Sequence, residues 1–240
     1  MKLSSRITLN LRVKELARLK TDYGIHERKN REALIAFLRD PAKMEGIDID
    51  EATGALRAPP IFVAARLGDY ELFSLLQALG SSKDLRYEGL TLYDAICAWP
   101  RKLAFFEYLE REGFDFTKET KWGTLPLLPL VASLALEEIK DSNNETNYYD
   151  SLLEIYEFFR GRGTDLNEGG EGKIRPLMIA ACANSLAVVK KLKADGAEAK
   201  RRGFVAEIGK EVDSVEYYRH KTGLGEIEER KEILHELESP

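Results

Sequence analysis

The sequence predicts an all-α fold, a solenoid of stacked helical repeats with degenerate helical caps at both ends. Five glycines each follow an apolar run with helical spacing. They are Gly46, Gly80, Gly113, Gly163 and Gly196, so the intervals between them are 34, 33, 50 and 33 residues. A self-similar period of this length is typical of repeat proteins. A composition of 44% hydrophobic and 32% charged residues is that of a folded chain.

The clearest repeat is 173–200. Arg175-Pro-Leu-Met-Ile-Ala-Ala181 begins a first helix, in which Pro176 suits the first turn because its missing N–H is not needed there. A turn at Ala183-Asn-Ser185 follows. An apolar stripe then predicts a second helix, with Leu186, Val188, Val189 and Leu192 as its members. Gly196 ends this helix, because glycine readily adopts the left-handed conformation found at helix C-termini.

Two repeats before it follow the same order. Repeat 58–88 opens with Pro59-Pro-Ile-Phe-Val-Ala-Ala65 and carries its second helix before Gly80. Repeat 89–122 opens with Leu90-Thr-Leu-Tyr-Asp-Ala95 and has a slightly longer turn between its helices, at Pro100. We therefore expect a first helix, a turn, a second helix and a loop in each.

Repeat 123–172 explains the 50-residue interval, since it exceeds the 33-residue unit by 17 residues. A polar, turn-forming stretch falls within an insertion at 137–149. The insertion is either an extension of the helices or a loop on one face of the stack. Insertions in repeat proteins often lie at the binding face, but a tolerated surface insertion explains the stretch equally well.

The two ends are expected to cap the stack, because a terminal repeat must present one face to water. Residues 1–57 form an N-terminal cap and a degenerate repeat. Residues 7–13 alternate like a strand, yet 13–19 fit a helix, and we favour the helix because a lone strand leaves an unpaired edge. Residues 201–240 are predicted as a helical cap, with Phe204, Val205 and Ile208 in a degenerate pair of helices before a charged helix near the C-terminus. The whole chain is predicted to be one continuous domain.

The opening and closing segments resemble those of ankyrin repeats, over about residues 46–200. Pro59-Pro-Ile-Phe-Val-Ala and Arg175-Pro-Leu-Met-Ile-Ala occupy the place of the Thr-Pro-Leu-His-x-Ala signature. Gly163-Thr-Asp-Leu-Asn167 is similar to the closing Gly-Ala-Asp-x-Asn segment. The signature histidine is replaced in all four repeats, by Phe62, Tyr93, Leu128 and Met178. The resemblance implies a concave groove, lined by loop tips and the outward sides of the first helices.

Other classes of function lack support in the sequence. A net charge of −5 disfavours general nucleic-acid binding, which needs a cationic surface. We find no apolar run long enough for a secretory signal or a membrane span, and we expect a cytoplasmic protein. Cys97 and Cys182 are expected to be buried thiols, and the three histidines lack partners at ligand spacing, so no metal or cofactor is predicted. We find no catalytic motif, and the non-repeat ends, 1–45 and 201–240, are too short for an independent active-site domain.

The predicted function is therefore non-catalytic binding of a partner protein by a chain that is monomeric when unbound. Because the chain is acidic, a basic partner would suit it. Two narrower roles stay open: an inhibitor or immunity-type protein that occludes a toxin or enzyme, and an effector that engages host proteins. The candidate partner-binding residues are exposed in an ankyrin-like stack and include the residue types that most often contribute to interfaces. They are Arg66, Tyr87, Asp94, Trp99, Lys121, Trp122, Glu168 and Glu171. For both tryptophans, ordinary packing between repeats is the alternative.

Overall fold

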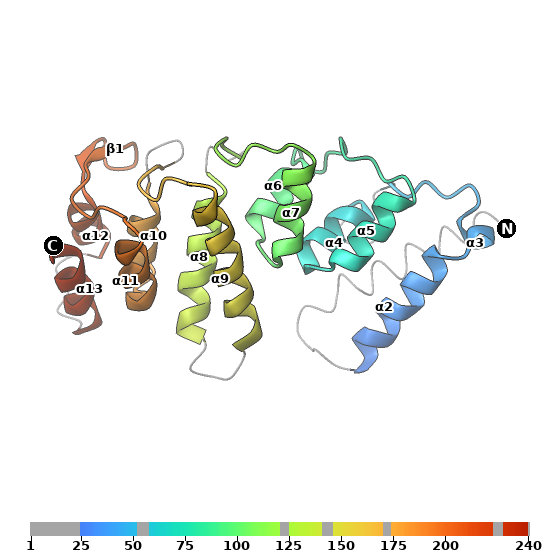
Figure 1. The fold of residues 1–240 in the computed structure, drawn as a ribbon, viewed down its shortest axis with the longest axis horizontal. Helices are drawn as coiled ribbons and strands as arrows, with labels where there is room; N and C mark the ends of the chain where they lie inside the picture. The colour runs from blue at the N-terminus through green and yellow to red at the C-terminus, as the bar shows by residue number, and fades with distance from the viewer. Residues whose placement is uncertain are drawn as a thin grey trace. The chain divides into compact units, whose positions relative to one another are not determined.

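A computed structural model of the chain is mostly helical (Figure 1). It describes residues 25–51, 58–120, 125–140, 146–169, 174–222 and 228–239. The helix predicted at 13–19 lies outside these residues. The chain packs as two compact units, 1–95 and 96–240, and the boundary between them falls inside the predicted repeat 89–122.

In the first unit, the described residues fold into α2 (Ile25–Leu38), α3 (Pro41–Met44), α4 (Pro60–Leu67) and α5 (Tyr70–Ala78). The apolar run before Gly46 predicts one helix over 29–44, and the structure divides this segment between α2 and the short α3. The apolar residues of α2 from Leu34 to Leu38 are buried except for Ala36. Arg31 of α2 donates to the carboxylate of Asp69 at the start of α5, with 2.5 Å between Nε and Oδ2. This ion pair joins the two helices.

The described residues of the second unit form further helices and a two-stranded sheet. α6 (Leu92–Ala98) spans the boundary between the units. It is followed by α7 (Leu103–Arg111), α8 (Leu127–Lys140), α9 (Thr146–Gly161), α10 (Pro176–Cys182), α11 (Leu186–Ala194), β1 (Gly203–Val205), β2 (Lys210–Val212), α12 (Ser214–Thr222) and α13 (Glu228–Glu238). The prolines predicted to open first helices do so, since α4 begins at Pro60 and α10 at Pro176.

The turns inside two of the helix pairs have the same backbone conformation. Gly68, between α4 and α5, and Asn184, between α10 and α11, have φ values of 72° and 57°. The next residues, Asp69 and Ser185, accept a hydrogen bond from the N–H three residues further on, at 3.0 and 3.4 Å. Each turn therefore ends one helix with a left-handed residue and caps the next with a polar side chain.

The closing glycines also share one conformation. All five have a positive φ, between 68° and 107°. The Gly163 N–H donates to Arg160 O at 2.9 Å, and the Thr164 N–H donates to Phe159 O at 3.3 Å. The same two bonds occur at Gly80, Gly113 and Gly196. This is the Schellman motif, which satisfies the last carbonyls of a helix, so the predicted helix ends are confirmed at these four glycines.

The extra residues of repeat 123–172 lengthen its helices. α8 and α9 have 14 and 16 residues, whereas α7 and α11 have nine each. Figure 1 shows α8 and α9 side by side along their length. Of the two alternatives for the insertion 137–149, helix extension therefore accounts for most of it. Residues 141–145 lie outside the described part.

An aromatic cluster holds α7 against α9. Phe106 and Phe116 pack with Phe158 and Phe159, and the ring centroids in contact are 5.3 to 6.3 Å apart. At the surface, the Arg162 guanidinium bonds both oxygens of Glu110, each at 2.5 Å. The core of this part of the chain is thus built from aromatic rings, with an ion pair over its edge.

The purely helical cap predicted for 201–240 is wrong in its first part. Residues 203–212 form an antiparallel hairpin in which Gly203 pairs with Val212 and Val205 with Lys210. Val205 and Val212 are buried, whereas Phe204, the residue before Val205 in β1, is 49% exposed. This period of two is that of a strand with one buried face. The helical interpretation used Phe204 as an apolar position of a helix, although its side chain lies on the exposed face of the hairpin.

Arg175 explains why the hairpin lies beside α10. Its buried guanidinium donates to Val212 O at 3.0 Å and to Arg201 O, so it satisfies carbonyls on both sides of the hairpin. Burial lowers the pKa of Arg175, as expected for a cation removed from water. A residue far from the hairpin in sequence therefore stabilises it.

Candidate binding pocket

The predicted site residues are divided between the two units. Arg66, Tyr87 and Asp94 belong to the first unit, and Trp99 and Glu168 belong to the second. The other three predicted residues, Lys121, Trp122 and Glu171, lie outside the described part of the chain. The charge of Arg66 opposes the rise in the pKa of the Tyr87 phenol that burial causes.

Asp94 has a structural role. Its Oδ2 accepts from the N–H and the hydroxyl of Thr91, at 2.9 and 2.8 Å, and its own N–H donates to Thr91 Oγ1 at 3.1 Å. These reciprocal bonds form a capping box at the start of α6. Asp94 is only 5% exposed, so its carboxylate is committed to the helix terminus.

Tyr87 stands at a tight turn. Tyr87 and Leu90 exchange both backbone hydrogen bonds, at 3.0 and 2.8 Å, around Glu88 and Gly89 with φ of 51° and 77°. Two positive φ values at the central positions define a type I′ turn. The Tyr87 ring packs edge-on against Phe62 of α4, with centroids 5.7 Å apart, and burial raises the pKa of its phenol. Tyr87 is thus half-buried at the first position of this turn.

Trp99 and Glu168 are both half-buried. Trp99 follows the last residue of α6, and the Glu168 N–H donates to Asp165 O at 3.3 Å in the loop after Gly163. Neither side chain lines the pocket described next.

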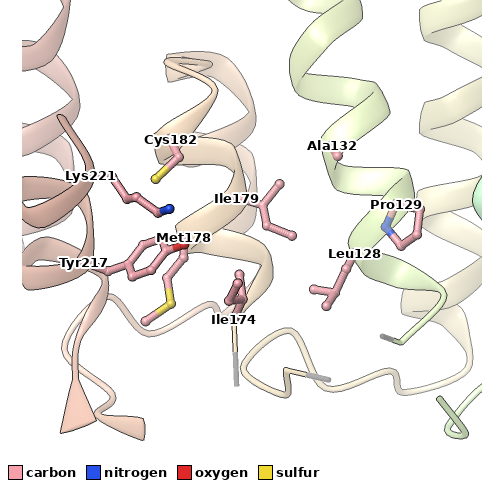
Figure 2. Close-up of a pocket in the computed structure, with 9 residues that line it drawn as sticks. All are labelled: Leu128, Pro129, Ala132, Ile174, Met178, Ile179, Cys182, Tyr217 and Lys221. Atoms are coloured by element: carbon pink, nitrogen blue, oxygen red, sulfur yellow. The ribbon is translucent and has the colours of Figure 1, made fainter. Parts of the chain in front are cut away.

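An apolar pocket lies in the second unit, between α8, α10 and α12 (Figure 2). Its volume is about 470 Å³, within the usual range for ligand pockets. Three helices supply eight of its nine lining residues, and the ninth lies two residues before α10. They are Leu128, Pro129 and Ala132 of α8, Ile174, Met178, Ile179 and Cys182 of α10 and its approach, and Tyr217 and Lys221 of α12. We call this set the α10 pocket.

The sequence of α10 explains why the pocket is apolar. Pro176–Cys182 contains no charged or hydroxyl side chain. Met178 packs into a buried cluster with Val205, Val212 and Tyr217, which supports one side of the pocket from behind. The first turns of α8 line the opposite side of the pocket.

One edge of the pocket is polar. Lys221 forms an ion pair with Glu207 in the turn of the hairpin, and the Tyr217 hydroxyl donates to the same carboxylate at 3.3 Å. The bond from Lys221 lowers the pKa of Glu207, whereas burial raises the pKa of Tyr217 well above its usual value. At neutral pH this edge therefore carries one ammonium, one carboxylate and one neutral phenol.

The pocket lining includes one thiol, that of Cys182. Burial raises the pKa of its thiol to about 11. Since the thiolate is the reactive form, Cys182 is protonated and poorly nucleophilic at neutral pH. The chemistry of the lining is that of a binding site for an apolar group.

The lining residues are not among the predicted site residues. The prediction placed binding on loop tips and on the outward sides of first helices, and its residues are charged or aromatic. The pocket is instead lined mostly by uncharged residues of helices. The uncharged run Pro176–Cys182 is the signal that the sequence offers for it.

A scan against protein-family models finds no match to this chain, and a sequence search of curated proteins finds no significant match. Among the described residues, no His, Cys, Asp and Glu side chains are grouped in a way that could hold a metal ion. Every helix that the structure describes is too short or too polar to cross a lipid bilayer.

Proposed function

We propose that this chain is a non-catalytic protein-binding module, and that the α10 pocket receives an apolar side chain of its partner. The observation that carries the proposal is the pocket itself: eight uncharged lining residues and a single ammonium, set between consecutive helix pairs. Interfaces gain most of their affinity where a few side chains enter well-packed pockets.

We also propose that the helix pairs are divergent ankyrin-like repeats. The shared left-handed turns, the Schellman motif after second helices and the 33-residue spacing support this interpretation. Binding at the first helices of neighbouring repeats is the mode that the resemblance implies. The pocket between α8, α10 and α12 is compatible with that mode.

The experiment compares two variants that add the same side chain in different places. Ala132→Phe fills the pocket from α8, whereas Ala187→Phe adds a phenyl ring to the exposed face of α11. Each purified variant and the wild type are used as bait in a quantitative affinity capture from the native source. Circular dichroism and thermal melts first establish that both variants are folded.

We expect Ala132→Phe to capture about tenfold less of at least one specific protein than the wild type does. Ala187→Phe should capture the same amount as the wild type. Tenfold is about 1.4 kcal/mol, which is less than a central interface residue commonly contributes. If every protein retained by the wild type is retained equally by Ala132→Phe, the pocket is not the binding site.

A further inference from the structure

The charge of the α10 pocket limits the partner that fits it. Lys221 is the one lining residue with a charge at neutral pH, and it stands at the end of α12. The lining contains no carboxylate, so it does not favour the basic partner expected from the acidic charge of the chain. The lining itself is therefore not acidic, and the nearby Glu207 carboxylate is paired with Lys221.

Lys221 lies on the α12 side of the pocket. Its Nζ lies 5.9 Å from the centroid of the Tyr217 ring, and Figure 2 shows the side chain reaching from α12 toward α10. An ammonium has three donors, and among the described residues the structure gives Lys221 one acceptor, Glu207. The Lys221 and Glu207 side chains are 36% and 48% exposed. A pair with this exposure contributes little to stability and is open to exchange.

We infer that the partner segment carries an apolar side chain directly beside an Asp or Glu, the apolar group in the α10 pocket and the carboxylate on Lys221. This inference rests on the proposed function and names the chemistry of the partner. Glu207 accepts from one of the three Lys221 donors. A bound segment would remove water from the other two, and donors buried without an acceptor are unfavourable. A carboxylate beside the apolar group forms a charge-assisted hydrogen bond, whereas a Lys or Arg there would be repelled.

Glu207 is the intramolecular competitor for this carboxylate. It lies in the turn between β1 and β2 and is exposed, so it can be changed without disturbing the core. Two variants should then act in opposite directions. Lys221→Met removes the ammonium but keeps an apolar stem of similar length, and Glu207→Gln removes the competing charge.

The probe is a set of peptides selected from a random dodecamer phage library on the immobilised full chain. Peptides that are enriched are synthesised with a fluorescent label, and their dissociation constants are measured by fluorescence polarisation. Four proteins are compared: the wild type, Ala132→Phe, Lys221→Met and Glu207→Gln. For each peptide, a version with Asn or Gln in place of its acidic residue is measured as well.

We expect enriched peptides to share an aliphatic or aromatic residue next to Asp or Glu. Ala132→Phe should abolish their binding, Lys221→Met should weaken it about tenfold, and Glu207→Gln should strengthen it about two- to fivefold, the range of exposed charge pairs. The amide version of each peptide should bind wild type and Lys221→Met equally. This last comparison assigns the effect to the carboxylate on Lys221.

The outcomes separate the two proposals. Some peptides could lose binding to Ala132→Phe and yet lack a carboxylate, or bind Lys221→Met as tightly as the wild type. Such peptides would overturn this inference and leave the proposed function standing. Peptides that bind Ala132→Phe as tightly as the wild type place binding elsewhere and contradict the proposed site. A selection that enriches no sequence counts against both.

Discussion

Asn167 bonds to the backbone of Glu198 in the next closing loop. Its Oδ1 accepts from the Glu198 N–H at 2.6 Å, and its Nδ2 donates to Gly196 O at 3.2 Å. Asn167 lies four residues after one closing glycine and Glu198 two residues after the next. Asp50, four residues after Gly46, makes the corresponding bond to the N–H of Ser82 at 2.9 Å. The same loop-to-loop bond thus occurs in both units.

Replacing Asn167 with Ala should lower the free energy of unfolding by about 1 kcal/mol, because two partly exposed hydrogen bonds are lost. Thr117→Ala is the matched control. Thr117 stands at the equivalent position after Gly113, but its hydroxyl donates to Asp115 in its own loop, at 2.6 Å. Urea unfolding of both variants measures the difference. Equal losses would show that the loop-to-loop bond does not stabilise the fold.

Gly163→Ala and Gly161→Ala should shift stability in opposite directions. A Cβ added at either glycine meets no atom within 4 Å, so the backbone conformation decides the outcome. Gly163 has φ of 72°, where a side chain costs roughly 1–2 kcal/mol. Gly161 is the last residue of α9 and has no positive φ, and alanine there should stabilise by up to about 1 kcal/mol.

Thermal melts of the two glycine variants are sufficient to check this prediction. A lower melting temperature for Gly163→Ala with an unchanged or higher one for Gly161→Ala is the expected result. Equal destabilisation by both changes would mean that helix α9 does not end as described.

Ala180→Leu should destabilise the chain by about 1–3 kcal/mol through overpacking. Ala180 has 0% exposure on α10, which packs against α8, α11 and α12, so the larger side chain has no room. Ala187→Leu, on the exposed face of α11, is the control and should change stability by less than about 0.5 kcal/mol. An unchanged melting temperature for Ala180→Leu would show that the helix packing is misplaced.

Cys182 should react with a thiol reagent in a strongly pH-dependent way. Its pKa is raised to about 11 by burial, so the thiolate fraction grows about tenfold per pH unit from pH 8 to 10. Iodoacetamide labelling followed by mass spectrometry measures the rate, and Cys182→Ala reports the contribution of Cys97, which has 0% exposure. A rate that levels off near pH 9, as for a free thiol, would contradict the burial of Cys182 in the pocket.

Much of the secondary structure could be predicted because its signals are local. Pro176 and Gly196 mark the two ends of a helix pair through their own backbone preferences, and the apolar stripe from Leu186 to Leu192 shows the face that is buried. Such preferences need only a few neighbouring residues. They are the reason that helix pairs of different sequence have turns and helix ends of the same conformation.

The hairpin at 203–212 was missed because a distant part of the chain stabilises it. Three-residue strands have weak signals of their own. The hairpin forms where Val205 and Val212 pack on Met178 and Tyr217, and where Arg175 satisfies its carbonyls. Asp94 was predicted to be an exposed binding residue because it is charged. It instead caps α6, since its carboxylate and the Thr91 side chain bond each other's backbone N–H groups.

The sequence by itself determined the class of fold, the order and ends of most helices, and the 33-residue rhythm, because each depends on the torsional preferences and periodicity of adjacent residues. The tertiary structure alone decided the α10 pocket and the hairpin beside it. Leu128, Met178 and Lys221 come from three segments far apart in the chain. They line one cavity only after helix packing has buried some apolar side chains and left others facing an open space.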